Sequence, residues 1–318
     1  MKSVRILAAA LLTAGLAMTA LPAASQSPSG AGPSKAAAKA GKPIKTGYVR
    51  ANGVDYHYQV HGKGEPLLVL HGGMGHTDMM APVIAQLART RQVIGVDLYG
   101  HGRTALTERP VSLVDMGDDM ARVLQQLGHK QVDVVGYSMG GGVGFRLAVQ
   151  HPQHVRRLVM VSAGYAQDGF FPELLPMQAQ VGAAMAEAMK ETPMYKSYVA
   201  VAPKPQDFPK LLDRMGALMR QPYDYADDVR KLAMPVMLVY GDSDMYRPEH
   251  IVKFYQLLGG GLKDAGWGRE HMARNRLAIL PGFTHYDLFL APSLVPTIMP
   301  FLDGKESKAS WLQQVNAK

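Results

Sequence analysis

The chain has 318 residues, of which 47% are hydrophobic, and its formal net charge is +8 at pH 7. This length suits one α/β domain with insertions, and the apolar content supports a sizeable core, which excludes a disordered chain and a membrane bundle. The sequence holds no cysteine, so disulfides, thiolate metal sites and a cysteine nucleophile are excluded together.

Residues 1–25 are predicted to form a secretory signal peptide. Lys2 and Arg5 precede an apolar stretch from Ile6 to about Leu21, and small residues follow it. A basic end, an apolar middle and a small-residue site are typical of a signal that is cleaved, here before Gln26. The alternative is an uncleaved membrane anchor, but the apolar stretch is short for a span. We therefore expect an exported protein, periplasmic or secreted, with no stable membrane span after signal cleavage.

Residues 26–46 are predicted to form a flexible basic linker, because they are rich in Ser, Gly, Ala, Pro and Lys and hold no aromatic residue. Two positive side chains lie in residues 1–25 and four in residues 26–46. Neither segment has an acidic residue, so +2 of the net +8 remains for the rest of the chain. Because the basic character belongs largely to the N-terminal end, we expect no nucleic-acid partner.

The first core segment, residues 47–164, is predicted to contain a hairpin and then strands that alternate with helices. Asn52 and Gly53 form the hairpin turn. Continuous apolar stretches then end in glycine or polar residues: PLLVLHGG, QVIGVDLYG, VDVVGYS and RLVMVSAG. Such stretches suit a parallel sheet that is buried on both faces. Among the helical patterns, SLVDMGDDMARVLQQLG has one apolar face, with Ser112 placed to cap its start and Gly128 to end it.

The alternation of strands and helices stops at residues 165–230, where we predict a helical cap inserted above the sheet. Met-rich helical patterns replace the strands there. Strands resume in the second core segment, residues 231–304, with PVMLVYGD and the weaker LAILPGFTH, and residues 305–318 are a C-terminal tail. Strands that alternate with helices predict an α/β fold with a doubly wound, mostly parallel sheet.

Residues 136–140, GYSMG, match the G-x-S-x-G pattern between an apolar strand and a helix, which is the context that the pattern requires. The turn strains the serine and exposes its side chain, while the glycines let the neighbouring backbone pass closely. Ser138 is therefore the candidate nucleophile, and the alternative is a plain glycine-rich corner. We expect Gly142, beyond the pattern, to let the first turn of the helix lie close to the sheet.

A serine hydroxyl needs a base that is oriented by a third group. His285 is the candidate base among eleven histidines, because it directly follows the last apolar strand. We expect His71 and His101 to have structural roles and His76 to lie near the mouth of the pocket. His151 and His154 are expected on the surface.

Two acids follow the strand PVMLVYGD or end it, Asp242 and Asp244. We favour Asp244, which precedes the next helix, whereas Asp242 could equally hold the turn through backbone N–H groups. The acid would fix the tautomer of the imidazole and stabilise the imidazolium.

An oxyanion hole needs donors that point at the developing charge. We expect the backbone N–H groups of Met139 and Gly73 to supply them, with Met74 as the alternative to Gly73. Further side chains near these positions are the candidate substrate contacts: Met74, Tyr137, Met177 and Tyr246.

Five segments resemble the α/β-hydrolase superfamily over about residues 47–302: LHGGMG, DLYGHGRT, GYSMGGG, GDSDMYRP and PGFTHYDL. Their order, with nucleophile, then acid, then histidine, is the family's own. The single cap resembles the esterase, haloperoxidase-like and carbon–carbon-bond hydrolase branches. Dehalogenases and epoxide hydrolases of this fold place an aspartate at the nucleophile, so Ser138 argues against both.

The chain departs from the family at residues 257–275, an insert that carries Trp267 and His271. We expect a solvent loop with a helical piece, and a second lid edge or a partner surface is the alternative. His271 is a rival for the base because it also follows the acid, although it lacks a preceding strand.

Together these features predict an exported, cofactor-independent serine hydrolase, a carboxylesterase for a small to medium hydrophobic ester. No metal is expected, because no histidine pair stands at helical ligand spacing with a carboxylate. The cap methionines suit a broad apolar pocket, although most are expected to pack the cap onto the sheet: Met177, Met185, Met189, Met215 and Met219. Alternatives are perhydrolysis of the haloperoxidase type, acyl transfer or carbon–carbon-bond hydrolysis and, from another class, a non-catalytic exported binding protein. The oligomeric state stays open.

Overall fold

The centre of the molecule is an eight-stranded sheet in the order β1-β2-β4-β3-β5-β6-β7-β8. The computed structural model describes residues 41–305 together with Trp311 and Val315. The strands are β1 (Lys45–Ala51), β2 (Val54–His61), β3 (Glu65–Leu70), β4 (Arg91–Val96), β5 (Val132–Tyr137), β6 (Val155–Val161), β7 (Val236–Ser243) and β8 (Arg276–Thr284). β2 pairs antiparallel with β1 and β4, and the remaining pairings are parallel. The predicted α/β fold with a mostly parallel sheet is confirmed.

The N-terminal hairpin has its turn where the sequence predicts it. Asn52 has φ 46° and Gly53 has φ 84°, the positive values that a tight two-residue hairpin turn requires. β1 begins at Lys45, two residues before the expected start of the core. The predicted signal peptide and most of the predicted linker lie outside the described residues. Within the part of the chain that the structure describes, no helix is both long and apolar enough to cross a bilayer.

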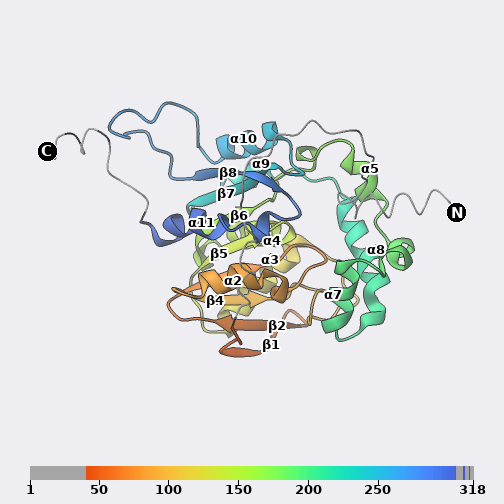
Figure 1. Cartoon of the computed structure of the whole chain (residues 1–318). Helices are drawn as coiled ribbons and strands as arrows, with labels where there is room; N and C mark the ends of the chain where they lie inside the picture. The colour runs from red at the N-terminus through yellow and green to blue at the C-terminus, as the bar shows by residue number, and fades with distance from the viewer. Residues whose placement is uncertain (1–40, 306–310, 312–314, 316–318) are drawn as a thin grey trace, which may run out of the picture.

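Helices cover both faces of the sheet (Figure 1). α2 (Ala81–Leu87) and α11 (Leu294–Asp303) share one apolar cluster with the strands. The opposite face packs against α3 (Leu113–Gln126), α4 (Met139–Gln150) and α10 (Pro248–Leu257). Side chains of β3 alternate between these clusters, Leu67 facing the first and Leu68 the second. The continuous apolar strands of the sequence therefore follow from burial on two faces.

The helix α3 shows how local signals set an element's ends. The Ser112 side chain accepts a hydrogen bond from the Asp115 N–H, 3.2 Å away, and so caps the first turn. Gly128 follows the helix with φ 83°. Between these ends, Met116 and Met120 are buried against the sheet. The predicted cap, apolar face and glycine stop are confirmed.

The described elements between β6 and β7 are all helical. They are α5 (Leu174–Ala179), α6 (Ala186–Met189), α7 (Pro193–Val201), α8 (Phe208–Met219) and α9 (Ala226–Arg230). The helices α5, α7 and α8 among them lie beside one end of the sheet, whereas α9 lies next to α10 (Figure 1). Short 3-10 turns also occur among the described residues: Thr77–Met80, Pro152–His154, Gln167–Gly169, Ala183–Met185, Pro205–Asp207 and Leu288–Leu290. α8 buries Leu211, Leu212 and Met215 and so anchors this helical segment to the core.

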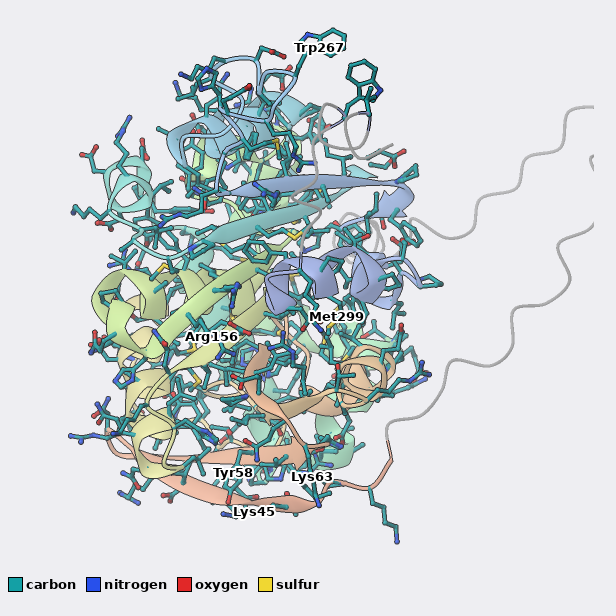
Figure 2. All side chains as sticks on the ribbon, turned by 90° about the vertical axis from the view of Figure 1, so that its left-hand side faces the viewer. Lys45, Tyr58, Lys63, Arg156, Trp267 and Met299 are labelled. Atoms are coloured by element: carbon teal, nitrogen blue, oxygen red, sulfur yellow. The ribbon has the colours of Figure 1, made fainter. Side chains whose placement is uncertain are left out.

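The insert after α10 is an irregular loop, so the helical piece expected within residues 257–275 is wrong. Helix α10 ends at Leu257, and the residues from there to β8 form turns and bends. Gly259, Gly261 and Gly266 adopt φ values of 84°, 62° and 79°, which a helix excludes. Trp267 is 72% exposed on this loop. Figure 2 shows it at the opposite end of the molecule from Lys45 and Tyr58.

Candidate active site

The candidate nucleophile stands on a strained turn between β5 and α4. Ser138 has φ 53° and ψ −119°, a conformation that L-residues rarely adopt. The backbone holds it there, since the Ser138 N–H donates to the Val161 carbonyl at 2.8 Å and the Gly142 N–H donates to the Ser138 carbonyl. Ser138 is half-buried and is the N-cap residue of α4. Strain of this kind marks functional turns.

Glycines on both sides of Ser138 make the turn possible. A Cβ at Gly136 would lie 2.2 Å from the Gly140 carbonyl oxygen, and a Cβ at Gly140 would lie 2.4 Å from the Leu70 carbonyl oxygen. Gly142 does not have the expected role of letting helix α4 approach the sheet. A Cβ there would meet the Leu113 side chain at 3.0 Å, so this glycine makes room for helix α3 instead.

His285 lies directly after β8 and faces Ser138. Its Nε2 is 3.1 Å from the Ser138 Oγ, within hydrogen-bond reach of a nucleophile and its base. The Tyr137 hydroxyl donates to the His285 carbonyl at 2.6 Å, which ties the histidine loop to the end of β5. The rival His271 is exposed in the insert loop, where its N–H donates to the Ala265 carbonyl. The structure therefore brings His285, and not His271, to the serine.

The two candidate acids occupy different environments. Asp244 is buried, and its Oδ1 accepts the Met245 N–H at 2.8 Å and stands 3.4 Å from the His285 Nδ1. Asp242 is exposed and accepts the Gly282 N–H at 2.9 Å. Asp242 thus holds the neighbouring strand end, the role that the sequence left open for it, while Asp244 lies beside the imidazole.

Sequence reasoning missed Ser162, the residue that follows β6. Its side chain is fully buried, and its φ is 53°, the same value as at Ser138. The Ser162 Oγ donates to the Asp244 Oδ2 at 2.5 Å and lies 2.6 Å from the His285 Nδ1. A signal was present, because Ser162 is a polar residue at the carboxyl end of a parallel strand, where the other site residues gather.

The two residues expected to supply the oxyanion-hole donors, Gly73 and Met139, lie next to each other. A Cβ at Gly73 would lie 4.0 Å from the Met139 Cβ, so the loop after β3 runs beside the first turn of α4. Met139 is the first residue of that helix, where backbone N–H groups have no partner within the helix. Met74 in the loop after β3 has φ 60°, so its backbone is strained like that of Ser138. Met215 of α8 reaches this place, because its Cε would touch that Gly73 Cβ at 3.1 Å.

Two expected substrate contacts are buried in the structure. Tyr137 packs against Phe289, and its hydroxyl is engaged by the His285 carbonyl, so the side chain supports the histidine from beneath. Tyr246 stacks on Phe170 at 4.6 Å between ring centroids. Burial raises the pKa of both tyrosine hydroxyls. Both rings thus pack against neighbouring side chains, and their contact with a substrate stays a prediction.

The cap methionines follow the expectation that most of them pack the cap onto the sheet. Four of the five belong to the main apolar cluster or pack against it: Met185, Met189, Met215 and Met219. Met177 on α5 is half-buried and stands apart from that cluster. Met74, in the loop after β3, is also half-buried. Met74 and Met177 remain candidates for contact with a substrate.

Three of the other histidines that the sequence analysis weighed have contacts that hold the fold. The His71 Nε2 accepts the Leu98 N–H at 2.9 Å, and burial lowers the pKa of this imidazole. His76, expected near the pocket mouth, lies 2.7 Å from the Ser197 Oγ of the cap helix α7. His154, expected on the surface, is buried, and its Nδ1 is 2.7 Å from the Lys130 carbonyl oxygen. Among the described residues no group of three or more His, Asp or Glu side chains is arranged to hold a metal ion.

Comparison with known proteins shows what this chain resembles. A family model described as the alpha/beta hydrolase fold matches residues 65–193. Carboxylesterase CesB (YbfK) of Bacillus subtilis has a similar structure, with a TM-score of 0.63 at 20% identity over 82% of this chain and 92% of that chain. At that identity the likeness shows the fold. The chain therefore has the α/β-hydrolase fold and matches the family model over residues 65–193.

Two of three relatives in sequence bear the name of a hydrolase or an esterase. A putative carbamate hydrolase RutD of Azorhizobium caulinodans is 34% identical over 42% of this chain and 51% of its own length. An uncharacterised protein of Mycobacterium bovis is 36% identical over 37% of this chain and 33% of its own length. The chain thus spans about half of the first of these relatives and about a third of the second. A pimeloyl-[acyl-carrier protein] methyl ester esterase of Nitrosomonas europaea is 26% identical over 72% of this chain and 92% of its own length.

Proposed function

We propose that the chain is an exported, cofactor-independent serine hydrolase that cleaves carboxylic esters. The observation that carries the proposal is the 3.1 Å between the Ser138 Oγ on its strained turn and the His285 Nε2. Asp244 stands behind the imidazole, on the side of Nδ1. Three groups in this order turn a weak hydroxyl into a nucleophile.

The first half of the reaction forms an acyl-enzyme. As the Ser138 Oγ attacks the carbonyl carbon of the ester, its proton passes to the His285 Nε2, and the carbonyl oxygen becomes an oxyanion. The backbone N–H groups of Met139 and Gly73 would donate to that oxygen at the start of α4, where the helix dipole favours negative charge. The intermediate then collapses, and the imidazolium gives its proton to the departing alkoxide, which leaves as the alcohol.

The second half releases the acid. Water enters where the alcohol was, gives a proton to the His285 Nε2 and attacks the acyl carbon. Collapse of this second intermediate breaks the bond to the Ser138 Oγ, which takes the proton back. The enzyme ends as it began, and the products are one carboxylic acid and one alcohol, so no cofactor or metal is required.

A small to medium hydrophobic ester suits the side chains around Ser138. Met139 is half-buried beside the serine, and the Met215 side chain of the cap helix α8 reaches Gly73 in the loop after β3. Thioether side chains adapt to apolar ligands of varied shape and offer no strong hydrogen bond. The methyl ester esterase among the relatives agrees with ester hydrolysis as the reaction.

Export rests on the sequence of residues 1–25, with their basic start, apolar middle and small-residue end. Expression of the full chain in a Gram-negative host, followed by fractionation and N-terminal sequencing of the mature protein, tests it. We expect a periplasmic or secreted product that begins at Gln26. Full-length protein retained in the cytosol or in the membrane fraction would remove export from the proposal.

A series of p-nitrophenyl esters of increasing acyl length tests the reaction. The wild-type chain is expected to hydrolyse short to medium esters, and Ser138→Ala is expected to be inactive with an unchanged thermal unfolding curve. Hydrolysis retained in Ser138→Ala would overturn the nucleophile. Peracid formation from acetate and peroxide that exceeds ester hydrolysis would instead indicate a perhydrolase, and a folded wild type without any turnover would favour a binding protein.

A further inference from the structure

We propose that Ser162 bridges the acid and the base of the site, so that Asp244 orients His285 through a serine hydroxyl. The proposal rests on the proposed function for its catalytic consequence, but its structural half concerns the three side chains alone. Ser162 is thereby a positioning residue, since it touches Asp244 and His285 and not the reacting atoms. Three observations support the bridge: its distances, its hydrogen-bond logic and its backbone.

The distances favour the bridge over a direct contact. The Asp244 Oδ1 stands 3.4 Å from the His285 Nδ1, which is long for a charge-assisted hydrogen bond of about 2.7–2.9 Å. The Ser162 Oγ, by contrast, is 2.5 Å from the Asp244 Oδ2 and 2.6 Å from the His285 Nδ1. The shorter path from carboxylate to imidazole therefore runs through the hydroxyl.

The hydrogen-bond logic gives each proton a place. An ionised carboxylate only accepts, so the single proton of the Ser162 hydroxyl must point at Asp244. The Ser162 Oγ is then left as an acceptor for the His285 Nδ1, which must carry a proton itself. A neutral imidazole that is protonated at Nδ1 is unprotonated at Nε2, the atom that faces Ser138. The bridge thus selects the tautomer that a general base needs.

The backbone presents Ser162 in the same way as the nucleophile, one strand further along the sheet. Ser138 follows β5 with φ 53°, and its N–H donates to the Val161 carbonyl at the end of β6. Ser162 follows β6 with φ 53°, and its N–H donates to the Val239 carbonyl of β7, again at 2.8 Å. A non-glycine residue held at positive φ is strained, and such strain persists where the surroundings require it.

Burial separates the roles of the two serines. Ser162 is fully buried, whereas Ser138 is half-buried. The Asp244 side chain is also fully enclosed and accepts the Gly241, Met245 and Tyr246 N–H groups besides the Ser162 hydroxyl. Because only neutral groups donate to Asp244, no fixed cation offsets the charge of its carboxylate. The hydroxyl dipole of Ser162, which points from His285 to Asp244, then stabilises an imidazolium at His285.

The test compares Ser162→Ala and Ser162→Gly with the control Tyr240→Phe. Glycine adopts a φ of 53° without strain, so Ser162→Gly removes the hydroxyl even if the alanine variant folds poorly. The control removes another buried hydroxyl nearby, which donates its hydrogen bond to the Ala163 carbonyl and not to Asp244 or His285. Each variant is measured for ester hydrolysis, for the labelling rate of Ser138 by a fluorophosphonate, and for its histidine tautomers by ¹⁵N NMR.

We expect kcat and the labelling rate to fall on the order of 10- to 100-fold in both Ser162 variants, as when an orienting partner is removed. KM should stay unchanged, because Ser162 does not reach the substrate. The ¹⁵N spectrum of His285 should show protonated Nδ1 in the wild type and a mixture of tautomers in the variants, while Tyr240→Phe resembles the wild type.

Wild-type rates and an unchanged tautomer in folded Ser162→Gly would overturn the bridge and show that Asp244 pairs directly with His285. An equal loss in Tyr240→Phe would overturn it as well, since any buried hydroxyl would then have the same effect. If the wild type neither hydrolyses esters nor reacts with the fluorophosphonate, the proposed function fails, and the NMR comparison still decides whether Ser162 holds the tautomer.

Discussion

The two edges of the parallel sheet bury acidic side chains in opposite ways. At the amino edge, Asp133 of β5 is enclosed by arginines, with the Arg91 guanidinium at 2.7 Å and two nitrogens of Arg156 at 2.9 Å. Figure 2 views the molecule from the side opposite the cap helices and labels Arg156 there. At the carboxyl edge, Asp244 has only an imidazole and neutral donors around it among the described residues.

The difference teaches which edge can do chemistry. The guanidinium groups around Asp133 already offset the charge of its carboxylate, so that carboxylate cannot stabilise a cation that forms during a reaction. The buried ion pairs at the amino edge therefore act on the stability of the fold. A carboxylate held by N–H and O–H groups keeps its charge and stabilises an imidazolium when one forms. Ligands of open α/β sheets bind at the carboxyl ends of the strands, which agrees with this division.

The largest expected effect is at the base. His285→Ala should lower ester hydrolysis by about 10⁴-fold or more, because the hydroxyl of Ser138 then keeps its proton. The free energy of unfolding should change little in comparison. Steady-state kinetics beside urea denaturation measure both quantities. If His285→Ala retained a tenth of the activity, another residue would be the base. The carboxyl edge of the sheet would then differ from the amino edge less than we infer.

The acid gives the next effect, and the two neighbouring aspartates make a matched pair. Asp244→Asn should lower kcat by roughly 10⁴-fold, the effect of losing the tautomer-fixing acid in a triad. Asp242→Asn should leave kcat near the wild-type value, because Asp242 accepts a backbone N–H at the surface. The same kinetic assay on both variants checks this, and a loss confined to Asp242→Asn would assign the acid to Asp242.

At the amino edge the expected effect is on stability alone. Asp133→Ala leaves two arginines without their buried partner and should lower the free energy of unfolding by about 3–5 kcal/mol. Glu65→Ala is the control, because Glu65 is an exposed partner of Arg156 and should contribute about 1 kcal/mol or less. Urea unfolding measures both. If Asp133→Ala were as stable as the wild type but inactive, the division of roles between the edges would be wrong.

A smaller effect is expected from acid. Burial and the nearby His71 lower the pKa of His101 to about 3, so this imidazole stays neutral in the folded chain. The unfolded chain binds a proton there below about pH 6.5, so stability is lost as the pH falls from 6.5 towards 3. Between pH 7 and 5 this loss is about 2 kcal/mol. His101→Gln should flatten the pH dependence of the unfolding free energy, and an unchanged slope would contradict the shift.

The smallest expected effect is at Tyr137, the residue before the nucleophile. Tyr137→Phe removes one hydrogen bond to the His285 carbonyl and should lower kcat by about 2- to 10-fold, the range of a single neutral hydrogen bond. Kinetics across the ester series separate this role from substrate contact. A change in KM that depends on acyl length, with kcat unchanged, would place Tyr137 among the substrate contacts.

The sequence predicted those parts of the site that local rules determine. Ser138, Asp244 and His285 were predicted because each follows or ends an apolar strand. The carboxyl ends of parallel strands meet at one edge of the sheet, so these residues were expected to lie close together. The hairpin turn and the capped helix α3 followed from Asn52, Gly53 and Ser112, whose backbone preferences are local.

The features that the sequence did not predict depend on side-chain direction or on distant contacts. Tyr137 precedes the nucleophile, but alternation along β5 directs its ring to the opposite face, towards Phe289. Gly142 makes room for Leu113 of another helix, a contact that no local rule contains. Ser162 belongs to no motif, and its meeting with Asp244 and His285 depends on a positive φ that only the three-dimensional structure reveals.

The central claim is that His285 activates Ser138, and the most direct measurement is fluorophosphonate labelling mapped by peptide mass spectrometry at neutral pH. The account predicts one adduct, on Ser138, that is absent from Ser138→Ala and forms far more slowly in His285→Ala. An adduct on another residue of the folded wild-type chain, or equal labelling of Ser138 in His285→Ala, would contradict it.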